Sequence, residues 1–226
     1  MSYFRQTVSR LRGCGHDVPM VSTTRPQRVR DRTRAALMSA AIDVLSDNAA
    51  ASMGEIATAA GVARSTLNRY FPDRAALTEG IEAFVEAEYE EAVRDARTAE
   101  GSGLAAYLRI VDEMLERLDT LGWWMRAAAD DDFDDLDCEA DRGIIAVIER
   151  GHQDGTVDTQ FTPSFMVGAT WSLLTAAYYD VRHGKRSRAE TRDLCRRGLT
   201  KLAASPTAEV ATERPGKRRR NDPADG

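Results

Sequence analysis

Side chains that could carry out catalysis are few in this 226-residue sequence, and they do not group. The three histidines, His16, His152 and His183, are far apart, and no glycine-rich phosphate loop accompanies them. The three cysteines are equally scattered and form no CxxC pair, so neither a disulfide framework nor a zinc knuckle is indicated. The sequence therefore favours a binding protein over an enzyme, and we expect neither a metal ion nor a cofactor.

Residues 52–74 offer a different chemistry, which is contact with phosphates and base edges. Ser52 and Glu55 have the spacing of a capping box, which predicts the start of a short helix. Gly61 then stands where the chain must turn sharply, and Ala57 is small enough to let two short helices cross. The outward face of the second helix is polar and basic: Arg64, Ser65, Asn68 and Arg69. The pattern predicts a helix-turn-helix that reads a DNA major groove, with a plain helical hairpin as the alternative.

Neighbouring elements must position this hairpin. Apolar residues at helical intervals predict a first helix over residues 28–47 that packs over the hairpin. Its N-terminal end carries Arg28, Arg30, Arg32 and Arg34, where the helix N-terminus and the basic charge both attract phosphate. Pro72 ends the second hairpin helix, and Asp73 caps a long amphipathic helix that runs toward Arg97 as a connector.

Residues 30–80 resemble the N-terminal domain of the TetR family of transcriptional regulators. The resemblance rests on Ile56-Ala57, Ala60-Gly61-Val62, Thr66-Leu67, Tyr70-Phe71 and Arg74, all after a long first helix. Two positions depart from the family pattern, since Asn68 replaces the usual Tyr and Arg74 the usual Lys. The resemblance implies an all-α fold, with an N-terminal three-helix DNA-binding domain and a C-terminal helical bundle for effector binding and dimerisation.

We expect DNA contacts from both the motif and the basic end of the first helix. Arg64 is the best candidate for reading a base, because an arginine there can contact guanine O6 and N7 together. Ser52 and Arg74 are expected on phosphates. The full set of expected DNA-binding residues is Arg28, Arg30, Ser52, Arg64, Ser65, Thr66, Asn68, Arg69, Tyr70 and Arg74.

The net charge of −5 is divided unevenly along the chain. Residues 1–80 hold eleven arginines against seven acids, a net charge of +4, whereas residues 81–206 hold fifteen basic against twenty-five acidic residues, a net charge of −10. A basic front half on an acidic body fits a DNA reader with a separate sensing domain. No apolar run approaches the ~20 residues that cross a bilayer, so we expect a cytoplasmic protein without membrane contact.

Composition and the positions of helix-breaking residues divide the chain into four parts. Residues 1–27 are expected to be a mostly disordered basic arm, and residues 206–226 a disordered tail with a basic run. Residues 28–74 form the expected DNA-binding domain, and residues 75–205 the helical effector-binding and dimerisation domain.

Within the second domain the chain breaks at Gly101, after which Ser102 can cap a helix with an apolar stripe that reaches Leu118. Aromatic side chains in this domain are of the kind that lines apolar pockets. Our candidate ligand-binding residues are Tyr107, Trp123, Trp124, Phe133, Trp171 and Tyr178. Core packing is the alternative explanation for each of them.

Eight of the twelve residues from Asp130 to Asp141 are acidic. Such a run usually forms a solvated loop or a helix start. It could also select a cationic ligand, or bind a hard cation such as Ca²⁺ or Mg²⁺, although the glycine and terminal glutamate of an EF-hand are missing.

The last two expected helices begin at Thr162-Pro163 and at the capping box from Ser187 to Glu190. The first of them has a face rich in small residues, which permits close helix approach. The resemblance to the TetR family implies that these two helices form a two-fold dimer interface. A symmetric dimer is also expected physically, because two recognition helices ~34–36 Å apart read a palindrome. The alternative is that both helices only close the core of their own chain.

These observations predict a homodimeric transcriptional regulator, with repression the expected direction, that binds palindromic double-stranded operator DNA. A small-molecule effector would release it. The alternative is a helical ligand-binding or interaction protein without sequence-specific DNA binding.

Overall fold

A computed structural model describes residues 25–127 and 138–205, and its regular structure is helical apart from an isolated bridge between Val157 and Ala204. This confirms the all-α prediction. Phe133, most of the acidic run, most of the N-terminal arm and the C-terminal tail lie outside the described residues. The helices are α2 (Arg25–Asp47), α3 (Met53–Ala59), α4 (Arg64–Tyr70), α5 (Arg74–Asp95), α6 (Gly103–Glu116), α7 (Leu118–Ala127), α8 (Glu139–Gln153), α9 (Pro163–Arg182) and α10 (Arg188–Ala203).

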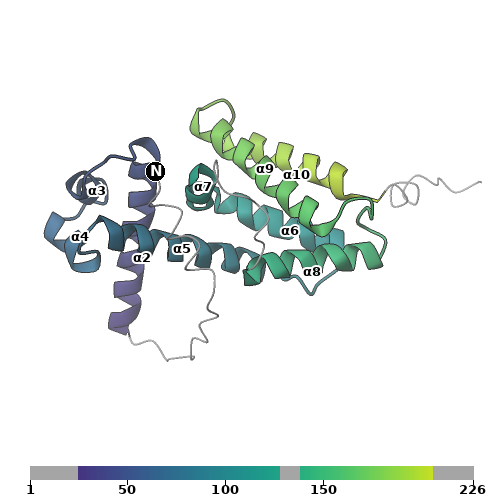
Figure 1. The fold of residues 1–226 in the computed structure, drawn as a ribbon, viewed down its shortest axis with the longest axis horizontal. Helices are drawn as coiled ribbons and strands as arrows, with labels where there is room; N and C mark the ends of the chain where they lie inside the picture. Colours follow the sequence, from purple (N-terminus) through teal and green to yellow (C-terminus); the bar gives the residue numbers. More distant parts are fainter. Residues whose placement is uncertain (1–24, 128–137, 206–226) are drawn as a thin grey trace, which may run out of the picture.

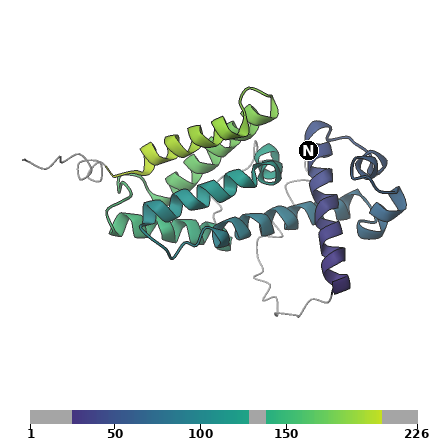
Figure 2. The same cartoon turned by 180° about the vertical axis from the view of Figure 1, so that it is seen from behind.

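The helices form a head and a body that share α5 (Figures 1 and 2). The head consists of α2, α3 and α4, and the body consists of α6 to α10. In the head, α2 packs on α3 and α3 packs on α4, with Leu37, Ile42, Ile56 and Leu67 buried between them. The predicted order of a long first helix over a short helical hairpin is therefore confirmed.

Helix α5 runs from the head along the body, as expected of a connector (Figure 1). Its first turns pack against the head, because a Cβ atom on Gly80 would lie only 2.7 Å from the Phe71 ring and 3.2 Å from the Arg34 guanidinium. Farther along, Val85 and Tyr89 are buried as α5 passes α6, α7 and α8. The expected domain boundary between residues 74 and 75 thus falls at the start of a helix that serves both parts.

Most helix starts follow the side chains that the sequence marks as caps. Ser52 with Glu55 and Ser187 with Glu190 form complete capping boxes. Asp73, Ser102 and Thr162 each accept a hydrogen bond from a backbone amide in the first turn of α5, α6 and α9. Five local predictions are therefore confirmed, since a cap depends only on residues three positions apart.

The apolar stripe that we expected to continue to Leu118 is broken into two helices. Helix α6 ends at Glu116, Arg117 leaves the helical conformation, and α7 starts at Leu118. The Arg117 guanidinium contacts the carboxylates of Glu113, Asp95 and Glu88 at 2.6, 2.5 and 3.5 Å. This ion-pair cluster joins the break to α5, and residue spacing alone does not reveal it.

The start of α6 is fixed by the loop after α8. The Asp154 carboxylate accepts from the Gly103 amide at 2.7 Å, and the Thr156 hydroxyl accepts from the Leu104 amide at 3.1 Å. A Cβ on Gly103 would lie 2.2 Å from the backbone of Gly151, so the two helices approach as closely as glycine allows. The segment around Gly151 thus locks α8 onto α6.

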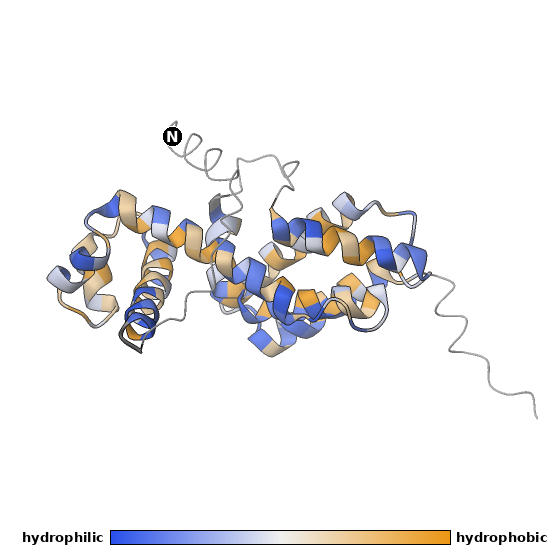
Figure 3. Cartoon of the chain, turned by 90° about the horizontal axis from the view of Figure 1, so that it is seen from below, coloured by the Kyte–Doolittle hydropathy of each residue, from blue (hydrophilic) through white to orange (hydrophobic). Residues whose placement is uncertain are grey.

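Buried apolar side chains form a core that extends from the head through α5 into the body. The hydropathy colouring in Figure 3 shows apolar and polar residues alternating along the helices of both the head and the body. None of the helices in the described ranges is both long and apolar enough to cross a membrane.

Candidate nucleic-acid interface and aromatic site

The corner between α3 and α4 has the geometry that its sequence predicts. The Ser52 amide donates to Glu55 Oε2 at 2.7 Å, and the Glu55 amide donates to Ser52 Oγ at 3.2 Å. The hydrogen bond from the Ser52 amide lowers the pKa of the Glu55 carboxyl. Gly61 has φ of 67°, and the Val62 amide closes the turn onto the Ala57 carbonyl at 3.0 Å. The left-handed conformation at the turn is the one that favours glycine.

Helix α4 presents the polar face that was predicted for it. Leu67 is fully buried against the head, whereas Arg64, Ser65, Asn68 and Arg69 are exposed. Thr66 and Tyr70 are half-buried at the edges of this face. The four exposed side chains are therefore free to meet a partner, and their DNA-binding role stays a prediction.

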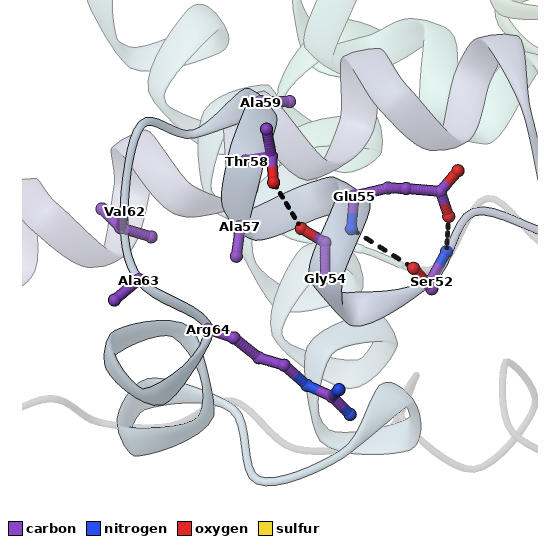
Figure 4. A pocket seen from close by; sticks show the side chains of 9 residues that line it. All are labelled: Ser52, Gly54, Glu55, Ala57, Thr58, Ala59, Val62, Ala63 and Arg64. Atoms are coloured by element: carbon purple, nitrogen blue, oxygen red, sulfur yellow. Dashed lines mark hydrogen bonds between the residues drawn. The ribbon is translucent and has the colours of Figure 1, made fainter.

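An open groove of about 740 Å³ separates α3 from the start of α4 (Figure 4). It is lined by small side chains such as Ala57 and Ala63 and by the polar side chains of Ser52, Glu55 and Arg64. The expected base reader and the expected phosphate contact thus lie on the same groove.

The basic end of α2 meets the far end of α4. The Arg30 and Arg69 guanidiniums lie 6.0 and 5.7 Å from the centre of the Tyr70 ring, and Arg34 lies 5.1 Å from the Phe71 ring. Such stacking orients a guanidinium while leaving its edge available for hydrogen bonds. Arg30, Arg69 and Tyr70, with the exposed Val29, line a second hollow of about 370 Å³. Arg28 is exposed one residue away from this hollow.

Arg74, which was expected to contact a phosphate, instead donates hydrogen bonds to backbone carbonyls within the head. Its Nη1 and Nη2 atoms donate to the carbonyls of Ala51 and Ala49, at 2.5 and 2.7 Å. The side chain is half-buried and holds the loop between α2 and α3. Its structural role is evident from these bonds, and a phosphate contact by Arg74 stays a prediction.

Three aromatic rings contact one another in the body. Two of them, Trp124 and Trp171, were predicted separately as candidate ligand-binding residues. Tyr89 lies 5.9 Å from Trp124 and 5.3 Å from Trp171, and the two indoles lie 6.2 Å apart. Tyr89 is buried, whereas both tryptophans are half-buried. We call Tyr89, Trp124 and Trp171, together with Glu82, the aromatic site.

Glu82 on α5 gives this site a negative charge. Trp123 Nε1 donates to one of its carboxylate oxygens at 2.6 Å, and Trp124 Nε1 donates to the other at 3.0 Å. Both donors are neutral, and no arginine or lysine of the described segments forms an ion pair with Glu82. Two indole N–H groups thus hold the carboxylate in place, and within the described segments it has no ion-pair partner.

A second carboxylate lies beneath the rings. The Tyr89 hydroxyl donates to Asp141 at 2.8 Å, and the Cys138 thiol donates to the other Asp141 oxygen at 3.0 Å. Burial, with the nearby Asp141 charge, raises the pKa of Tyr89, and burial likewise raises the pKa of the Cys138 thiol to about 12. Both groups therefore remain protonated donors to Asp141.

Tyr107 and Tyr178 take no part in the ring contacts that define the aromatic site. Tyr107 is fully buried, with its hydroxyl 2.6 Å from that of Thr170. Tyr178 is buried against Gly122, where a Cβ would lie 2.2 Å from the ring. Both contribute to packing in this structure, and their role toward a ligand stays a prediction, as does that of Phe133.

Sequence reasoning did not select Glu82 or Tyr89, and it included Asp141 only as the end of the acidic run that could select a cationic ligand. Glu82 and Tyr89 both lie in the helix that was expected after Asp73, and this helix was predicted only to connect the two domains. Glu82 is an acidic residue next to buried apolar positions, and this could have marked it as a candidate. Its tryptophan partners are about forty residues away, so the sequence does not show that they meet. Within residues 25–127 and 138–205, no cluster of His, Cys, Asp and Glu has the form of a metal site.

The fold and the corner geometry define a helix-turn-helix regulatory protein with an attached helical body. The sequence profile of bacterial regulatory proteins of the tetR family matches residues 37–81. The chain is 30% identical over 167 residues to the HTH-type transcriptional repressor LfrR of Mycolicibacterium smegmatis, covering 73% of this chain and 87% of that protein. The chain belongs to the TetR family of transcriptional regulators.

Solved structures agree with this assignment. The TetR-like regulator LfrR from Mycobacterium smegmatis in complex with proflavine aligns with a TM-score of 0.56 and 28% identity, over 77% of this chain and 97% of that chain. A TetR family transcription regulator from Marinobacter aquaeolei VT8 aligns with a TM-score of 0.50 and 16% identity, over 79% and 99% of the two chains. The second similarity concerns the fold alone.

Proposed function

We propose that this regulator is a homodimeric repressor that binds palindromic operator DNA in the cytoplasm and releases it when a small aromatic cation binds the body. The observation that carries the DNA-binding part is the exposed basic and polar face of α4 beside the arginines of α2. Repression is proposed from the similarity to LfrR, which is described as a transcriptional repressor.

The proposed DNA contacts divide into base reading and phosphate binding. Arg64 at the start of α4 reads a guanine, and Ser65, Thr66, Asn68, Arg69 and Tyr70 add base and phosphate contacts. Arg28 and Arg30 of α2 bind phosphates at one side, while Ser52 and Arg74 bind them at the other. Asn68 offers a shorter side chain than the tyrosine usual in the family, so this position is where operator preference is expected to differ.

The proposed dimer surface is the outer face of α9 and α10. Phe165 and Tyr179 are exposed by 54% and 38% on α9, and Leu194 is exposed by 45% on α10. Between the two aromatic residues lie Gly168, Ser172 and Ala176, and the space over Gly168 is open. Cys195 and Leu199 of α10 are instead buried in the body, so they are not available to a partner. A second copy would cover these apolar side chains.

The proposed effector class follows from the aromatic site. A planar cation is attracted by the faces of Trp and Tyr rings and by a carboxylate such as that of Glu82. LfrR has been solved in complex with proflavine, which is a planar aromatic cation. The same chemical class therefore suits the site in this chain.

Selection of bound DNA from a random pool, followed by determination of the stoichiometry, tests this function. We expect one inverted-repeat sequence to be enriched and to bind two protomers, with an affinity that decreases as salt increases because phosphate contacts release counterions. Adding proflavine should release the protein from this DNA. A pool without an enriched sequence would favour the alternative of a helical interaction protein.

A further inference from the structure

The head and the body meet at the C-terminal end of α2, which two arginines of the body contact. Arg126, near the end of α7, donates from Nη1 to the Leu45 carbonyl at 2.8 Å. Arg182, the last residue of α9, donates to the Asp43 carbonyl at 3.4 Å and pairs with the Asp47 carboxylate. Both guanidiniums lie at the negative end of the α2 dipole, where cations are stabilised.

Charged groups of three helices surround these two arginines. Desolvation and the nearby Asp119 raise the pKa of Asp43, whereas Arg182 opposes this shift. Asp119 itself pairs with Arg188 of α10. The polar contacts at this end of α2 therefore lie beside the buried core to which Leu45 and Leu121 belong.

The end of α2 controls the position of the DNA-reading helices. It leads through residues 48–51 into α3, and Arg74 holds the carbonyls of Ala49 and Ala51 from the other side of this loop. A displacement of Leu45 relative to the body therefore moves α3, and α4 moves with it because the two helices are packed together.

The first arginine is connected directly to the aromatic site. Arg126 follows Trp124 by two residues within α7, and Trp123 and Trp124 both donate to Glu82. A ligand that competes for the Glu82 carboxylate or separates the rings must displace these indoles. Since α7 is one short helix, its displacement changes the position of Arg126.

The second arginine is connected to the same helix through Tyr178. The Arg182 guanidinium lies 5.8 Å from the centre of the Tyr178 ring. That ring packs directly on Gly122, the residue before Trp123, and its buried hydroxyl has no hydrogen-bond partner in the described structure. The ring is therefore positioned by its packing on Gly122 and by the Arg182 guanidinium, so a shift of α7 at Gly122 is transmitted to Tyr178 and Arg182.

We propose that Arg126 and Arg182 form a clamp on the C-terminal end of α2, and that an effector in the aromatic site loosens this clamp by displacing α7. This inference rests on the proposed function and names the route of its regulation. The route passes through α7 and α9, in addition to the connector α5.

The test compares wild type with the double variant Arg126→Ala/Arg182→Ala. Operator affinity is measured by fluorescence anisotropy on labelled selected DNA, with and without proflavine, and proflavine affinity is measured without DNA by quenching of the three tryptophans. Allosteric factors are typically about 5- to 150-fold, and we expect proflavine to weaken operator binding of wild type within this range. In the double variant the weakening should be less than about 3-fold, while proflavine affinity changes by less than about 3-fold.

Arg192→Ala is the matched control, because Arg192 also pairs with acids but only within the body, with Glu116 and Asp112. In this control, proflavine should weaken operator binding by the same factor as in wild type. The control also shares any direct effect of the dye on DNA. Asp47→Ala removes one partner of Arg182 at a side chain that is 79% exposed, so it tests the clamp should the double variant not fold. In this variant, the factor by which proflavine weakens operator binding should be about half that of wild type or less.

The clamp would be overturned if proflavine weakened operator binding of the double variant as much as that of wild type. Where only Asp47→Ala folds, the same result in that variant would overturn it. Wild type that binds operator but ignores proflavine would overturn the proposed effector, and the clamp with it. The two failures are therefore distinguished by the wild-type measurement alone.

Discussion

Arginines in the head have different roles according to what their guanidiniums contact. Arg74 is engaged by loop carbonyls and Arg34 lies over Phe71, whereas Arg64 on the α3–α4 groove is exposed. An exposed arginine that makes no bond within the head can give all its donors to a partner. The residue type alone does not distinguish these roles, but the contacts do.

Arg64→Ala should weaken binding to the selected operator by about 1–3 kcal/mol and relax the preference for one base pair, because a bidentate contact with guanine is lost. Competition gel shifts with operators altered one base pair at a time measure both effects. Arg94→Ala, an exposed arginine at the far end of α5, is the control. Unchanged affinity and unchanged preference would rule out Arg64 as the base reader.

Glu82→Gln should weaken proflavine binding about tenfold, equivalent to ~1.4 kcal/mol, because the negative charge beside the rings is removed while the side-chain size is kept. Acridone, a neutral ring system of similar shape, should bind wild type and variant within about twofold of each other. Tryptophan quenching measures both affinities. Glu79→Gln, an exposed residue on the same helix, is the matched variant. Equal loss for both compounds would show that Glu82 supports only the shape of the site.

At the scale of elements, the start of α6 depends on a residue fifty positions away in sequence. Desolvation acts to raise the pKa of Asp154, but hydrogen bonds from the Thr156 hydroxyl and from the Gly103 and Thr156 amides outweigh it, and the pKa is lowered. The ionised carboxylate is therefore the form that stabilises the joint between α6 and α8.

Asp154→Asn should lower the free energy of unfolding at pH 7 by about 0.5–2 kcal/mol, as expected for loss of a capping carboxylate. Because the folded pKa lies below the usual value of 3.8, the stabilisation is complete above that value and is lost as the pH decreases through the folded pKa. Urea unfolding at pH 7 and at pH 3 should therefore show a smaller difference between wild type and variant at pH 3. A difference that grows at low pH would contradict the assignment.

At the scale of the whole molecule, the charge division gives the head and the body separate roles. The described head exposes arginines at one end of an elongated molecule, and the exposed apolar side chains of α9 and α10 lie on the body (Figures 1 and 2). A two-fold axis through the body would leave both heads free to bind one duplex.

Phe165→Asp combined with Leu194→Asp should convert a dimer of about 50 kDa into a monomer of 24.9 kDa. Two charges would then face apolar surface across the two-fold axis, and operator affinity should decrease by about 100-fold or more because each half-site binds alone. Light scattering during size-exclusion chromatography measures the mass. Val29→Asp places the same charge at an exposed apolar site in the head and should leave the dimer intact. A wild-type monomer would refute the interface.

Sequence reasoning succeeded where structure depends on neighbouring residues. The capping boxes, the turn at Gly61, the exposed face of α4 and the helical class are all present as predicted. It failed at α7, because the helix break at Arg117 is stabilised by carboxylates of α5, and residue spacing within α6 does not reveal them.

The sequence by itself determined the helix-turn-helix. A cap, a glycine turn and a buried leucine fix its short helices through contacts within one or two turns. Only the tertiary structure decided what surrounds it. The use of Arg74 as a loop support, the pairing of two tryptophans with Glu82 and the contact of Arg126 and Arg182 with α2 all join residues more than twenty positions apart. Such contacts depend on how helices pack, and helix packing is not encoded in any local pattern.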